Sequence, residues 1–153
     1  MIVDVDDVSK IEETKRDIEN NIELKKAYLE MLSGCINNPE NRIWYALWNI
    51  ELKNSPDKII VGNFSFKGLN PDGIVEIGYG LKENFRHKGY MTETIKTISK
   101  WALSQKNIKS IEAETEPDNK ASQKILLSAG FIITEKFGKE GPRYKLTRDK
   151  LIF

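Results

Sequence analysis

Residues 84 to 94, NFRHKGYMTET, place basic side chains, one glycine and a threonine directly after a segment that we predict to be a strand. A helix that begins there would offer unpaired backbone N–H groups and about half a positive charge. Gly89 would let the backbone approach an anion closely, while Arg86 and Lys88 add charge at the rim and Thr92 adds a hydroxyl. The segment therefore predicts a pocket for an anion such as a pyrophosphate.

A basic loop that merely begins a helix would have the same composition. The segment has neither the GxGxxG of a dinucleotide-binding fold nor the GK[ST] of a P-loop. Taken alone, it is explained as well by a helix start as by a binding site.

The strand before this loop, residues 74 to 81, alternates in a way that supports the binding site. One face would carry Val75, Ile77, Tyr79 and Leu81, and the other Glu76, Gly78 and Gly80. Glycines within a strand weaken it and often mark the close approach of another backbone or a ligand. If this strand separates from residues 108 to 115, an extended arm containing amides could pair with its exposed edge.

The elements that would position this site follow from hydrophobic periodicity and turn residues. We expect a short strand at residues 2 to 5 and a helix from Ser9 to about Leu32, with a Ser9–Glu12 capping box and Gly34 as its stop. An antiparallel meander follows, and then alternating helices and strands. The strands of the meander would span residues 42–52, 59–66 and 74–81. The later helices would span residues 88–105 and 119–129, and the later strands would span residues 108–115, 131–137 and 143–146.

Composition limits the classes of function. The chain has 153 residues, which suits one α/β domain, and its 24 Lys and Arg against 23 Asp and Glu give a net charge of +1. That balance does not favour a nucleic-acid partner. Cys35 is the only cysteine, so neither an internal disulfide nor a cysteine-ligated metal site is expected. With no apolar span or signal sequence, we expect a cytoplasmic protein that does not bind membranes.

Two runs carry a family resemblance: VEIGYGLKENFRHKGYMTETIKTISKWAL and IKSIEAETEPDNKASQKILLSAGF. They resemble the GNAT superfamily of N-acetyltransferases, and within it the branch that acetylates the N-termini of ribosomal proteins. The cofactor-loop pattern [RQ]-x-x-G-x-[GA] corresponds to residues 86 to 91, where Met91 replaces the usual small last residue. The resemblance covers residues 43–146 and is poor over residues 1–42, which would be a divergent helical part of a single domain, 1–153.

The resemblance implies a mixed, mostly antiparallel sheet with a splayed central strand pair, flanked by helices. It also implies acetyl-CoA as co-substrate, with no metal. The pyrophosphate would bind the loop and the pantetheine arm would lie in the splay. The implied cofactor-binding residues are Ile77, Tyr79, Gly80, Leu81, Arg86, His87, Lys88, Gly89, Tyr90, Met91, Thr92, Asn119 and Ser122.

Acetyl transfer to an amine requires a neutral amine, and a carboxylate acting through water could take its proton. Glu76 is our first candidate for this base because it shares the glycine-lined face of its strand, and Glu114 and Glu140 follow. Each could instead be an ordinary solvated or salt-bridged residue, and for Glu114 that interpretation is the better one. A backbone N–H of residues 79 to 81 would hold the developing oxyanion.

The leaving thiolate needs a proton. Many relatives carry a tyrosine for this purpose seven residues after the asparagine that corresponds to Asn119, but here that position is Leu126. Ser122 stands where the ribosomal branch carries a serine in this role. It could instead be a simple first-turn hydroxyl of the helix.

The expected function is therefore N-acetyl transfer from acetyl-CoA to a protein N-terminus or a small amine. A catalytically silent CoA-binding or protein-interaction domain on the same fold is the alternative. Aromatic edge strands would also be compatible with a homodimer.

Overall fold

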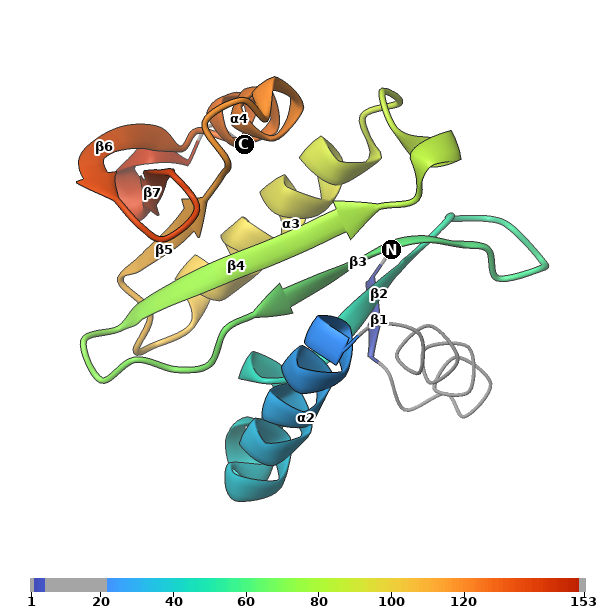
Figure 1. Cartoon of the computed structure of the whole chain (residues 1–153), viewed down its shortest axis with the longest axis horizontal. Coiled ribbons are helices and arrows are strands. Elements are labelled where there is room, and N and C mark those ends of the chain that lie inside the picture. Colours follow the sequence, from blue (N-terminus) through green and yellow to red (C-terminus); the bar gives the residue numbers. More distant parts are fainter. Residues whose placement is uncertain (1, 5–21, 152–153) are drawn as a thin grey trace.

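The computed structural model describes residues 2–4 and 22–151. In these residues seven strands form one sheet in the order β1-β2-β3-β4-β5-β7-β6 (Figure 1). The fold is thus the predicted mixed, mostly antiparallel α/β type. The strands are β1 Ile2–Asp4, β2 Leu47–Glu51, β3 Ile60–Phe66, β4 Ile74–Leu81, β5 Ser110–Glu114, β6 Ile132–Phe137 and β7 Pro142–Thr147.

The centre of the sheet is a fork between β4 and β5, its one parallel pair in the described residues. The pairing runs from Ile74 opposite Ser110 to Ile77 opposite Ala113 and stops there. β4 continues to Leu81 with β3 on its other side, while β5 turns toward α4 (Figure 1). The splayed central pair is therefore confirmed, and its last shared rung is Ile77–Ala113.

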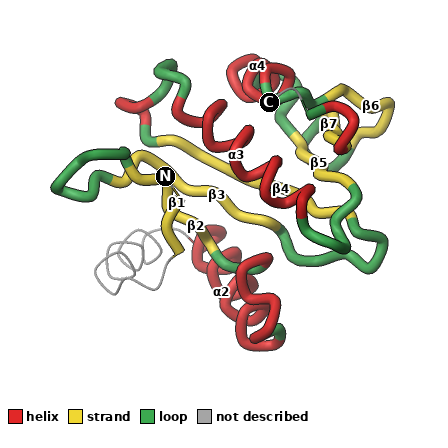
Figure 2. The backbone as a smooth tube through the Cα atoms, turned by 180° about the vertical axis from the view of Figure 1, so that it is seen from behind, coloured by secondary structure: helices red, strands yellow, loops and turns green. Residues whose placement is uncertain are grey.

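Helix α3 (Tyr90–Ser104) covers one face of the sheet; it lies behind β4 in Figure 1 and in front of it in Figure 2. Its inward face buries Met91, Thr94, Ile95, Ile98, Ser99, Ala102 and Leu103. The apolar ones among them pack in the core with the alternate strand residues Val75, Ile77, Ile111 and Ala113. The remaining helices are α2 Ile22–Asn37, α4 Lys120–Ser128 and the 3₁₀ helices η1 Pro39–Trp44, η2 Glu83–Phe85 and η3 Arg148–Lys150.

The prediction of a strand over residues 42–52 is wrong in its first half. The 3₁₀ helix η1 occupies residues 39–44 with a proline in its first turn, and β2 begins only at Leu47. The reason is tertiary: Trp44 turns into the core, where its ring stacks on Trp101 with centroids 5.2 Å apart. Only the second half of the predicted strand, from Leu47, is therefore a strand.

The predicted helix stop at Gly34 is also wrong, because α2 continues to Asn37. An added Cβ at Gly34 would lie 2.7 Å from Cδ1 of Tyr45, so close packing explains this glycine. The Ser9–Glu12 capping box lies outside the described residues. No helix in the part of the chain that the structure describes is long and apolar enough to cross a bilayer.

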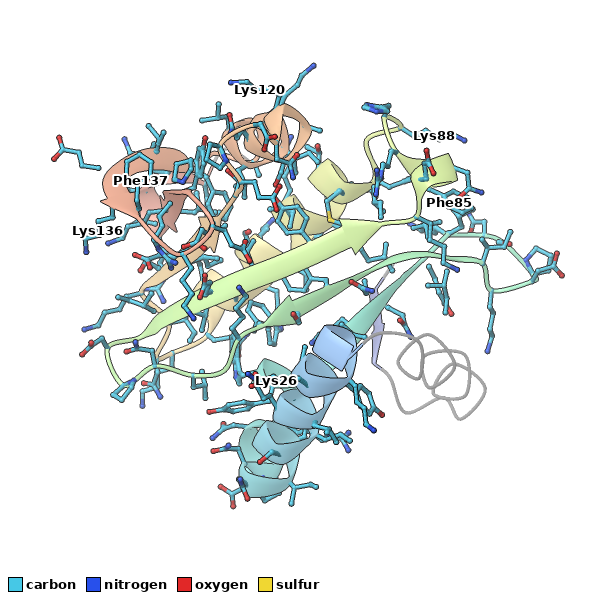
Figure 3. The ribbon with its side chains drawn as sticks, viewed as in Figure 1. Lys26, Phe85, Lys88, Lys120, Lys136 and Phe137 are labelled. Atoms are coloured by element: carbon cyan, nitrogen blue, oxygen red, sulfur yellow. The ribbon has the colours of Figure 1, made fainter. Side chains whose placement is uncertain are left out.

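The aromatic strand β2 is not at the sheet edge, since β1 and β3 flank it. The edge on the far side is β6, whose Phe137 is 74% exposed (Figure 3). An exposed aromatic residue at a sheet edge is thus found in β6 and not in β2, and dimerisation stays a prediction.

Candidate active site

The loop between β4 and α3 has the backbone geometry expected of an anion pocket. Gly89 is the N-cap of α3 with a φ of 81°, and His87 also has a positive φ of 63°. The first helical hydrogen bond runs from the N–H of Glu93 to the carbonyl of Gly89 at 3.1 Å. The N–H groups of residues 90 to 92 precede that bond and lie at the open end of the helix.

The space beside Gly89 is empty of protein, since a Cβ added there would meet no described atom within 4 Å. The left-handed backbone at position 89 therefore explains why a glycine stands there, whereas close packing against neighbouring atoms does not. Two basic side chains at the rim of this space contact residues of the preceding segment. Arg86 Nε donates to the carbonyl of Leu81 at 3.3 Å, and Lys88 Nζ lies 5.9 Å from the ring centroid of Phe85 (Figure 3).

Beyond the last shared rung, β4 has one paired and one unpaired edge. Gly78 and Gly80 pair with Ser65 and Asn63 of β3, and β5 has already diverged. An added Cβ at either glycine would meet its nearest heavy atom no closer than 3.5 Å, which is ordinary contact. Packing within the described protein therefore does not require these glycines, as expected if they leave room for a ligand.

Ser122 and Asn119 lie together at the start of α4. Asn119 is the N-cap, and its Oδ1 accepts the backbone N–H of Ser122 at 3.1 Å. The hydroxyl of Ser122 lies 2.7 Å from that of Tyr79 on the diverging part of β4. Leu126, where many relatives would carry the acid, is fully buried in the core.

Glu76 lies on the opposite face of β4 from Tyr79, in a cluster around Arg143 of β7. Arg143 Nη1 lies 3.1 Å from Glu76 and 3.0 Å from Glu114, while its Nη2 lies 3.0 Å from Glu112. Lys67 Nζ adds a longer contact of 3.6 Å with Glu76. The cluster spans β4, β5 and β7. It lies where β4 and β5 are still paired, since Glu76 and Glu112 are opposite each other one residue before the last pair, Ile77–Ala113.

The cluster makes Glu114 a poor candidate for a base. Its carboxylate accepts the backbone N–H of Glu140 at 2.9 Å, and this bond lowers the pKa of Glu114, aided by Arg143. Glu114 is only 9% exposed, whereas Glu76 is 27% exposed. Glu140 contributes its main chain to this contact, and its side chain is exposed. In the residues that the structure describes, no cluster of His, Cys, Asp or Glu could hold a metal ion.

Comparison of the sequence with family models decides the family. The model described as "Acetyltransferase (GNAT) domain" matches residues 5–132, which is most of the chain. The chain belongs to the GNAT acetyltransferase family.

Individual GNAT relatives are similar over part of their length. "Uncharacterized N-acetyltransferase YjdG" of Bacillus subtilis (strain 168) is 40% identical over 91 residues, which cover 58% of this chain and 52% of that protein. The chain thus spans about half the length of the curated relatives that it matches.

Two solved GNAT structures share the fold. A ribosomal-protein-alanine acetyltransferase from Vibrio fischeri is 17% identical, covering 76% of this chain and 68% of that one, with a TM-score of 0.60. RimL, a ribosomal-protein alpha-N-acetyltransferase in complex with coenzyme A, is 19% identical. The match covers 69% of this chain and 63% of that one, with a TM-score of 0.57. At these identities the likeness concerns the fold.

The structure of this GNAT chain sorts the predicted site residues into two groups. Those of the loop, the diverging part of β4 and the start of α4 lie along the fork and the open helix end, whereas Glu76 lies on the other face. The sequence did not predict that Arg143 would pair with Glu76, or that the hydroxyl of Tyr79 would contact that of Ser122. The alternation of residues 143 to 146 would have placed Arg143 on a surface face, but nothing in the pattern named its partners.

The ion pairs around Arg143 should make the free energy of unfolding depend on pH. Replacing Arg143 by Met leaves three carboxylates close together, so we expect the free energy of unfolding at pH 7 to fall by about 1–3 kcal/mol, less than for a fully buried pair. The pKa of Glu114 is lowered in the folded protein, chiefly by the backbone N–H of Glu140 and further by Arg143. The contribution of Arg143 therefore stabilises the fold above the unfolded pKa of Glu114 and is lost as the pH falls through the folded value. The stability lost in Arg143→Met should therefore shrink below about pH 4.3, the ordinary pKa of a glutamate.

Urea denaturation of both proteins between pH 7 and pH 3 measures this effect. Arg148→Met is the control, since Arg148 donates to the main-chain carbonyls of Leu103, Gln105 and Ile108. Its cost should not depend on the ionisation of carboxylates. If the cost of Arg143→Met is the same at pH 7 and pH 3, ion pairing in the cluster does not stabilise the fold.

Proposed function

We propose that this chain is an acetyl-CoA-dependent N-acetyltransferase that acts on a primary amine, either a protein N-terminus or a small molecule. The observation that carries the proposal is the β4–β5 fork, which opens after Ile77–Ala113, together with the open N-terminus of α3, which follows the diverging end of β4 in the chain. An extended amide-containing arm with a pyrophosphate needs these two features together: an unpaired strand edge and a cluster of free N–H groups.

The residues present fit coenzyme A. The N–H groups of residues 87 to 92 would hold the pyrophosphate, with Arg86 and Lys88 at the rim. The unpaired edge of residues 78 to 81 would pair with the pantetheine amides. When bound, the cofactor supplies an activated acetyl thioester.

Two side chains on opposite faces of β4 would handle the protons. Glu76 contacts both Arg143 and Lys67 through Oε1, which leaves its Oε2 available to a water molecule that takes the proton of the amine. Ser122, on the face toward α4, would protonate the leaving sulfur. In this arrangement the base on one face of β4 would serve the acceptor amine, and the acid on the other face would serve the sulfur of the cofactor.

The acceptor amine must lose a proton before it attacks. An α-amine, with a pKa of about 7.7–8.0, does so far more readily than a lysine side chain, with a pKa of about 10.4. A protein N-terminus therefore demands less of Glu76 than a lysine or a polyamine. The salt bridge of Glu76 is the observation that favours the rival function, a CoA-binding domain without catalysis.

A binding and turnover experiment tests the proposal. At 100 times its dissociation constant, acetyl-CoA should stabilise the protein by about 2.7 kcal/mol, which corresponds to roughly 5–10 °C in melting temperature. Thiol release is then followed with a panel of amines: an alanine-initiated peptide, spermidine and kanamycin. A protein whose melting temperature does not change with acetyl-CoA has neither function, and one that is stabilised but never releases thiol is the silent domain.

A further inference from the structure

One hydrogen bond joins the two arms of the candidate site. The hydroxyls of Tyr79 and Ser122 lie 2.7 Å apart, although 43 residues separate them along the chain. Tyr79 lies two residues beyond the last rung of the fork, and Ser122 lies in the first turn of α4. This hydroxyl pair therefore joins the part of β4 that has diverged from β5 to the helix that carries the candidate acid.

Two contacts hold Ser122, and they act on different atoms. Asn119 Oδ1 accepts the backbone N–H of Ser122 and so fixes its main chain, but it leaves the side chain free to choose among its rotamers. The bond to Tyr79 fixes the hydroxyl itself. The helix cap alone therefore does not determine where the serine proton points.

The direction of the hydrogen bond determines whether that proton is free. Each hydroxyl has one hydrogen, so if Tyr79 donates, the hydrogen of Ser122 can point elsewhere. A phenol is a stronger acid than an alcohol and is the better donor. Burial raises the pKa of Tyr79, more than the bond to Ser122 lowers it, so the phenol keeps its proton at neutral pH.

We propose that Tyr79 is a positioning residue for Ser122, to which it donates a hydrogen bond so that the serine proton faces the leaving sulfur. The inference rests on the proposed function, in which Ser122 is the acid. As the C–N bond forms and the C–S bond breaks with its electrons on sulfur, Ser122 gives its proton to sulfur. The proton of the amine passes through water to Glu76, and exchange with solvent afterwards returns a proton to Ser122 and removes one from Glu76, while Tyr79 keeps its own proton and its hydrogen bond to Oγ.

Tyr79→Phe tests this because it removes the hydroxyl and keeps the ring in place. We expect kcat to fall about tenfold while KM for acetyl-CoA stays within about twofold. In a Ser122→Ala background, which itself should lose much more, the same change should have no further effect, because the two hydroxyls act as one unit. The amine is the best acceptor of the panel named above, and thiol release is the readout.

Tyr144→Phe is the matched control: Tyr144 is a buried tyrosine close enough to Tyr79 to influence its pKa, and it has no assigned role. It should keep wild-type turnover, and the melting temperature of each variant reports its folding. Wild-type turnover in Tyr79→Phe, or an equal loss in both backgrounds, overturns the inference and leaves the proposed function intact. If the wild-type protein releases no thiol with any amine, the proposed function itself fails.

Discussion

Gly89→Glu should abolish acetyl-CoA binding, with a loss in affinity of at least about a hundredfold. A carboxylate about 4 Å from a phosphate is opposed by roughly 4 kcal/mol at an effective dielectric constant of 20. The effect on folding should be small by comparison. An added Cβ meets nothing within 4 Å, so the cost is the left-handed backbone, about 1–2 kcal/mol.

Two neutral substitutions at the same position separate charge from strain. Gly89→Ala has the backbone strain without the charge, and Gly89→Asn adds a neutral side chain of a type that tolerates a positive φ. Both should bind acetyl-CoA far better than Gly89→Glu in titration calorimetry. Unchanged affinity in Gly89→Glu would show that the pyrophosphate binds elsewhere.

Glu76→Gln should lower kcat by about a hundredfold and leave acetyl-CoA affinity unchanged, since an amide cannot accept the proton of the amine. The glutamine oxygen can still accept from Arg143, so the cluster keeps its geometry. Steady-state thiol release and calorimetry on the same preparation measure the two effects.

Glu112→Gln is a close control for this prediction. Glu112 lies opposite Glu76 in the β4–β5 register and also pairs with Arg143, so the charge removed from the cluster is the same. It should keep turnover within about threefold of wild type. Equal losses in the two variants would mean that the cluster acts through its total charge, and Glu76 would have no special role as a base.

The sequence predicted the parts of the site that depend on local pattern. Period-two alternation placed Glu76 and Tyr79 on opposite faces of β4, and the glycine before a periodic apolar stretch located the start of α3. The fork was predicted from two mid-strand glycines and the family resemblance, and the register then fixed where it begins.

The rest depends on contacts between distant residues. Arg143 lies 67 residues from Glu76, and the alternation of β7 does not reveal which carboxylates it meets. The bridge from Tyr79 to Ser122 likewise requires knowing that α4 packs against the diverging part of β4. Trp44 failed as a strand residue for the same reason, since stacking on Trp101 outweighs the strand preference of an aromatic side chain.

A crystal structure of the protein with coenzyme A tests the central claim most directly. We expect the pyrophosphate on the main-chain N–H groups of residues 87 to 92 and the pantetheine amides hydrogen-bonded to residues 78 to 81, with β4 and β5 still parted after Ile77–Ala113. A complex in which the two strands are zipped together beyond that rung, or in which the pyrophosphate lies away from α3, would contradict the account.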